Sequence, residues 1–100
     1  GAALGVIGGS VMECVTARRA DGRRCRLRLP AGFDVRVRRR AEVAWRDWVA
    51  GLRKAVRLKP RRELLKLDVG QGWRLLSDDE GSCWTLLSHA QYTQRLQRRP

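Results

Sequence analysis

The sequence predicts a small α+β domain in which a mixed sheet packs on one main helix. An alternating run split by an Asp-Gly pair predicts a β-hairpin, and apolar residues at helical spacing follow it. Short apolar runs between turn residues then predict further strands. With 100 residues, 43% of them hydrophobic, the chain suits one domain. We expect a flexible, uncharged leader over residues 1–10 and a single domain over 11–100.

The first hairpin has the clearest pattern in the chain. In its second strand, apolar and arginine side chains alternate, which places all the arginines on one face of the sheet. The apolar members are Cys25, Leu27 and Leu29, and the arginines are Arg24, Arg26 and Arg28. A two-residue turn at Asp21-Gly22 would place Arg18 opposite Cys25.

A long helix is predicted over residues 38–58. Its apolar side chains repeat at helical spacing and form one stripe. The members of this stripe are Ala41, Trp45, Trp48, Val49, Leu52 and Val56. Lys59-Pro60 ends the helix, because the residue before a proline avoids the helical region. Gly51 then falls inside the helix, where a glycine costs about 1 kcal/mol relative to alanine.

The second half of the chain predicts three short strands and a final helix. The strands cover residues 63–69, 73–76 and 83–87, and a polar, acidic turn at 77–82 separates the last two. Ser88 and Gln91 have the spacing of a capping box, in which each side chain bonds the backbone of the other residue. A short helix that carries Tyr92 and Leu96 therefore follows.

Residues for catalysis or metal binding are scarce. The chain has three cysteines without a CxxC pair and a single histidine, His89, so we expect no metal site, no cofactor and no enzyme activity. The carboxylates of residues 78–80 are consecutive and solvated, which does not suit acid–base catalysis. The apolar leader is too short to cross a membrane, and the odd cysteine count favours free thiols. We expect a cytoplasmic protein.

Positive charge is the strongest functional signal. Lys and Arg number 22 against 10 Asp and Glu, giving a net charge of +12. Nearly all the cations are arginines, which bind carboxylate or phosphate in bidentate fashion. The candidate binding residues on the hairpin are Arg18, Arg19, Arg24, Arg26 and Arg28. They predict a surface for an acidic partner, and the alternative is a solvated face that reflects compositional bias alone.

The predicted element order is similar to that of the ubiquitin-like β-grasp. Within it, residues 75–96 resemble the acidic motif of Phox-and-Bem-type interaction domains, in which an acidic turn precedes a strand, a serine and a short helix. The matching positions are Asp78, Asp79, Glu80, Gly81, Thr85, Leu86, Ser88, Tyr92 and Leu96. The hairpin resembles the opening of that family, where a basic residue, here Arg18 or Arg19, pairs with the acidic motif of a partner.

This resemblance implies a non-catalytic protein-interaction module of a larger scaffold protein. Its partner would be a protein with an acidic surface, or a second copy that offers Asp78, Asp79 and Glu80. Complementary patches on opposite sides of the domain would allow such contacts to propagate. A more distant resemblance to the ubiquitin-like head domains of trypanosomatid cytoskeletal scaffolds adds association with the cytoskeleton.

The alternative reading is nucleic-acid binding, of RNA in particular, through the same arginines. A charge of +12 on a small domain suits the neutralisation of phosphates. Trp73 and Trp84 offer rings that can stack on bases, although tryptophan in a small domain more often belongs to the core. Steep salt dependence would distinguish nucleic-acid binding from a packed protein interface.

Overall fold

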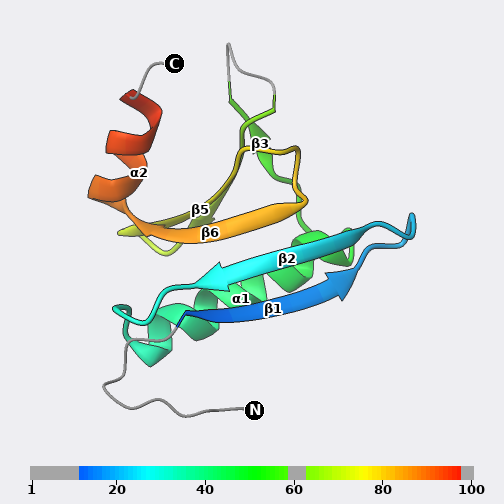
Figure 1. Ribbon diagram of the computed structural model, residues 1–100, viewed down its shortest axis with the longest axis horizontal. Helices are drawn as coiled ribbons and strands as arrows, with labels where there is room; N and C mark the ends of the chain where they lie inside the picture. Colours follow the sequence, from blue (N-terminus) through cyan, green and yellow to red (C-terminus); the bar gives the residue numbers. More distant parts are fainter. Residues whose placement is uncertain (1–11, 59–62, 98–100) are drawn as a thin grey trace.

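The computed structural model describes residues 12–58 and 63–97 and confirms an α+β domain. Six strands form one mixed sheet in the order β1-β2-β6-β5-β4-β3, in which β2 and β6 are parallel and the other neighbours antiparallel (Figure 1). The elements are β1 (Glu13–Arg18), β2 (Arg24–Leu29), α1 (Val35–Val49), β3 (Val56–Arg57), β4 (Leu65–Val69), β5 (Trp73–Ser77), β6 (Cys83–Ser88) and α2 (His89–Gln97). No matching structure supports the finer β-grasp assignment. The predicted leader lies outside the described residues.

The core lies between α1 and one face of the sheet. Alternate residues of the strands point to this face, as the period of a strand requires. Trp45 from α1 and Trp84 from β6 are both fully buried there, and Trp48 meets Trp84 edge to face at 4.9 Å between ring centroids. Trp84 is therefore a core residue, and Trp73 packs partly buried against the same cluster. The buried ring of Trp84 is not free to stack on a base.

The β1–β2 hairpin has a longer loop than the sequence predicts. The N–H of Arg19 donates to the carbonyl of Arg23 at 2.8 Å, which leaves residues 20–22 as the loop, and its last residue, Gly22, has a φ of 88°. This three-residue loop with a left-handed last residue shifts the register by one. Arg18 consequently lies opposite Arg24 rather than Cys25. The expected register was wrong, and the shift keeps Arg18 off the core face.

Helix α1 begins and ends earlier than predicted. The Oδ1 atom of Asp34 accepts the backbone N–H of Arg36 at 2.7 Å and caps the helix N-terminus. At the other end the helix stops at Val49, so the predicted extension to residue 58 was wrong. Leu52 and Val56, which were assigned to the buried stripe, are 79% and 51% exposed.

Gly51 explains the early end of α1. Its φ of 80° is left-handed, which glycine adopts without strain. The N–H of Gly51 donates to the carbonyl of Trp48 at 3.0 Å, and the N–H of Leu52 donates to that of Asp47 at 2.8 Å. These two bonds form a Schellman motif, which satisfies carbonyls at the helix end. Gly51 is thus a C-terminal signal rather than a costly interior residue.

The later elements agree closely with the prediction. Strands β4, β5 and β6 cover the expected segments, and the predicted capping box begins α2. Gln91 Oε1 accepts the N–H of Ser88 at 3.0 Å, and Ser88 Oγ accepts the N–H of Gln91 at 3.2 Å. Tyr92 of α2 packs on Leu76 and Leu87, on the sheet face away from α1. Helix α2 therefore covers part of that second face.

Candidate functional site

Four arginines occupy the uncovered part of the second face. The hairpin register places Arg18 of β1 directly opposite Arg24 of β2, and Arg26 and Arg28 continue along β2 on the same face. We call Arg18, Arg24, Arg26 and Arg28 the arginine face. All four side chains are exposed, and no ion pair joins them to a carboxylate within residues 12–58 and 63–97. Four like charges thus lie on one surface without a counterion from the described chain.

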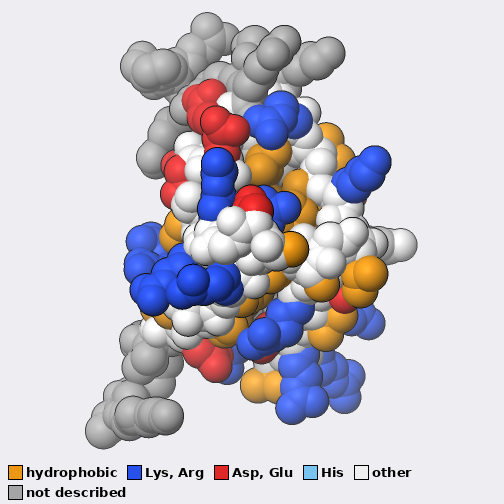
Figure 2. Space-filling view, turned by 90° about the vertical axis from the view of Figure 1, so that its right-hand side faces the viewer, with side chains coloured by type: hydrophobic (Ala, Val, Ile, Leu, Met, Phe, Trp, Pro, Cys, Tyr) orange, Lys and Arg blue, Asp and Glu red, His pale blue; other side chains and the backbone are white. Residues whose placement is uncertain are grey.

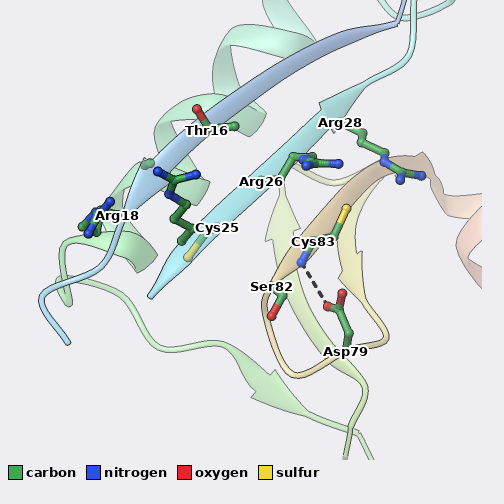
Figure 3. A pocket seen from close by; sticks show the side chains of 10 residues that line it. Thr16, Arg18, Cys25, Arg26, Arg28, Asp79, Ser82 and Cys83 are labelled. Carbon is green, nitrogen blue, oxygen red and sulfur yellow. Dashed lines mark hydrogen bonds between the residues drawn. The ribbon is translucent and has the colours of Figure 1, made fainter. Parts of the chain in front are cut away.

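Small side chains flank this row of arginines. Thr16 of β1 and Cys83 of β6 lie on either side of Arg26, and Cys14 and Thr85 on either side of Arg28. A groove of about 760 Å³ follows the surface, and Arg26 and Arg28 extend from β2 toward β6 above Cys83 (Figure 3). Its lining residues are Thr16, Ala17, Arg18, Arg24, Cys25, Arg26, Arg28, Asp79, Ser82 and Cys83. The site is a shallow, strongly basic groove.

The acidic turn lies beside the arginine face. Asp79 lines the same groove, because the parallel pairing of β2 with β6 brings the start of β6 next to Arg26 (Figure 3). Asp79 therefore does not lie on the opposite side of the domain from the arginine face, the arrangement that would let contacts between copies propagate. Asp79 Oδ1 accepts hydrogen bonds from Ser77 Oγ at 2.8 Å and from the N–H of Cys83 at 3.0 Å. This carboxylate shapes the turn.

The three carboxylates of this turn do not act as one cluster. Glu80, with φ of 62°, lies 3.6 Å from Arg57 in an exposed ion pair. Asp78 is exposed, and Asp79 bonds within the turn. Ser77, which sequence reasoning missed, is 1% exposed and accepts the N–H of Gly81 through Oγ at 2.8 Å. Its position at the end of a strand before an acidic turn was the only available signal.

Arg19 does not belong to the arginine face. Its guanidinium carbon lies 4.3 Å from the ring centroid of Trp48, and its side chain is half-buried. This cation–π contact holds the hairpin loop against the end of α1. Of the five hairpin arginines predicted as partner-binding, four share the open surface and Arg19 has a structural contact.

The cysteines contribute little nucleophilic character to the groove. All three are free. Burial raises the pKa of the Cys25 thiol, and Arg19 opposes this only in part. Burial likewise raises the pKa of Cys83, although Arg28 and Arg26 lower it. Both thiols are therefore protonated at neutral pH, the form that reacts poorly.

The wider surface repeats the charge pattern of the groove. Figure 2 shows Lys and Arg side chains spread over the face turned to the viewer, with acidic side chains in smaller patches.

Among residues 12–58 and 63–97, no group of three or more His, Cys, Asp or Glu is placed to hold a metal ion. None of the helices in these ranges has the length and apolar content needed to cross a membrane.

Comparison with protein families finds a match to the ParE-like toxin domain over residues 35–94. The matched segment runs from the start of α1 into α2 and leaves out the β1–β2 hairpin. Comparisons with curated proteins and with solved structures found no match.

This match overturns the Phox-and-Bem resemblance, together with the scaffold-module function and the cytoskeletal association that depended on it. The motif misled because its residues have local roles: Asp79 orders a turn and Ser88 caps a helix, as in many unrelated turn–strand–helix segments. Because the family match spans residues 35–94, more than half of the 100 residues, the chain belongs to the ParE-like toxin domain family.

Proposed function

We propose that this chain is the toxin component of a toxin–antitoxin pair and that an antitoxin protein binds it. The observation that carries this proposal is the family match from α1 to α2, which covers most of the core and the sheet. A toxin domain implies a protein partner. The net charge of +12 and the uncompensated arginine face support a partner with an acidic surface.

The proposed action is binding rather than catalysis. The single histidine, His89, is exposed at the first residue of α2, and the two thiols of the groove are held protonated by burial. These features favour a toxin that engages its target through a surface. A cytoplasmic location, which suits three free thiols, is part of the same proposal.

Inducible expression in a bacterial host tests the toxin function. Growth and viable counts are followed after induction of the wild type and of Leu86→Ser. Leu86 is fully buried, so the serine removes core packing and leaves an unsatisfied hydroxyl while the net charge stays unchanged. We expect the wild type to stop growth and Leu86→Ser, at matched levels on an immunoblot, to permit it.

This comparison separates a folded toxin from a merely basic protein. A highly cationic chain can harm a cell through non-specific binding to nucleic acid. Equal arrest by both chains would therefore assign the effect to charge, and normal growth with both would exclude a toxin for this host. Either result contradicts the proposal.

A further inference from the structure

We infer that the arginine face receives an extended acidic segment of the antitoxin, with a carboxylate at every second residue. This inference rests on the proposed function for the identity of the partner. It concerns the β1–β2 hairpin, which lies outside the matched family segment. The chemistry of the face itself specifies the ligand.

The spacing of the arginines favours an extended ligand. Arg24, Arg26 and Arg28 are alternate residues of one strand, so their Cα atoms repeat at about 6.6–6.8 Å. Alternate side chains of an extended peptide repeat at the same distance, so three successive carboxylates can each meet one guanidinium. The neighbours on an acidic helix are three or four residues apart and do not keep this step over a straight row.

The groove has room for such a segment beside the row. Thr16 and Cys83 flank Arg26 with short side chains, so the arginines rise above their neighbours on both strands. Asp79 borders the groove on the β6 side and disfavours a carboxylate there. Arg18, on the β1 side, adds a fourth cation. The acidic segment therefore follows the row of arginines along β2, between Arg18 at one edge of the groove and Asp79 at the other.

The same surface suits a peptide better than a nucleic acid. Phosphates would satisfy arginines equally well, but single-stranded nucleic acid is usually held by aromatic side chains that stack on the bases. None of the described residues that line the groove is aromatic. The rings of Trp48, from α1, and Trp84, from β6, are buried in the core on the opposite face of the sheet.

Fluorescence anisotropy with two labelled peptides tests the inference. In one peptide Glu alternates with Thr, and in the other the same residues are arranged as a block of Glu and a block of Thr. The protein is the wild type, a face variant with Arg24, Arg26 and Arg28 changed to Gln, or a control variant with Arg36, Arg39 and Arg40 changed to Gln. All six arginines are exposed, so both variants lose equal charge from the surface.

We expect the alternating peptide to bind the wild type more tightly than the block peptide. The face variant should lose about tenfold or more in affinity for it, since three surface ion pairs each contribute a few-fold. The control variant should lose much less. Thermal melts of the three proteins establish that each is folded.

Three results would overturn the inference: equal affinity of the wild type for both peptides, equal losses in the two variants, or a single-stranded oligonucleotide that binds the arginine face more tightly than the alternating peptide. None of these depends on growth arrest. A failed expression assay with an intact peptide preference rejects the toxin and keeps the acidic-segment site, and the reverse rejects the site alone.

Discussion

At the scale of single residues, Gly81 is the position least able to accept a side chain. A Cβ added there would lie 2.8 Å from Cη2 and 2.9 Å from Cζ2 of Trp48, and the φ of Gly81 is 102°. Trp48 is buried between Trp84 and the Arg19 guanidinium, so its ring cannot easily move. Backbone strain and overpacking together should make Gly81→Ala cost about 3 kcal/mol in the free energy of unfolding.

Gly22 supplies the matched control for this prediction. It also has a left-handed φ, of 88°, but nothing lies within 4 Å of an added Cβ. Gly22→Ala should therefore show the strain alone, about 1 kcal/mol. Denaturant unfolding of both variants measures the difference, and equal costs would mean that the contact of Gly81 with Trp48 carries no energy.

Cys25 predicts how stability depends on pH. Burial raises its pKa in the folded state, whereas the thiol ionises at its ordinary pKa of 9.0 when the chain unfolds. The folded chain then binds more protons than the unfolded chain above pH 9, so the free energy of unfolding falls as pH rises through this range and is fully retained below it. Cys25→Ala should lose this part of the alkaline dependence.

Unfolding curves from pH 7 to 10.5 on the wild type and Cys25→Ala test this. The difference between the two proteins, rather than either curve alone, isolates the thiol, because other groups also titrate in this range. The control variant is Cys14→Ala, which removes an exposed thiol. A constant difference between the wild type and Cys25→Ala across the range would refute the linkage.

At the scale of elements, Gly51 allows the sign of one effect to be predicted. A glycine inside a helix destabilises it, so Gly51→Ala would gain about 1 kcal/mol if α1 continued to residue 58. The observed Schellman motif, with φ of 80° at Gly51, instead predicts a loss of about 1 kcal/mol. Open space around this Cα excludes a steric contribution. Denaturant unfolding gives the sign directly.

The elements that sequence reasoning predicted correctly have local causes. The alternation in β2 and the Ser88–Gln91 capping box are each written within a few residues, and both are observed. Helix α1 was misplaced because its apolar repeat continues through Leu52 and Val56, while Gly51 ends the helix by its backbone conformation. The presence of a glycine in the sequence does not reveal whether its φ is positive. Tertiary structure decides it.

The candidate site was predictable only in part for a similar reason. The alternation pattern places Arg24, Arg26 and Arg28 on one face, whereas Arg18 joins them only through the three-residue loop that sets the hairpin register. The proximity of Asp79 to this face depends on the parallel pairing of β2 with β6, which joins segments far apart in the chain. No local pattern encodes that pairing.

At the scale of the whole molecule, the net charge of +12 acts against the compact state. Arg18 and Arg24 lie directly opposite each other, an arrangement of like charges that costs a fraction of a kcal/mol up to about 1 kcal/mol. Added salt screens this repulsion, so the free energy of unfolding should rise with NaCl concentration. A face kept at such a cost is typical of a surface that serves a partner.

The variant with Arg24, Arg26 and Arg28 changed to Gln makes this argument testable. It should be at least as stable as the wild type at low salt, and its stability should depend less on NaCl, because three like charges have left one surface. Denaturant unfolding at low and high salt measures both quantities. If the variant is less stable than the wild type at low salt, the arginines support the fold itself. A role in stability would then explain why these arginines cluster, without a partner. Unchanged or greater stability together with lost peptide binding would instead show that the arginines serve binding and not folding.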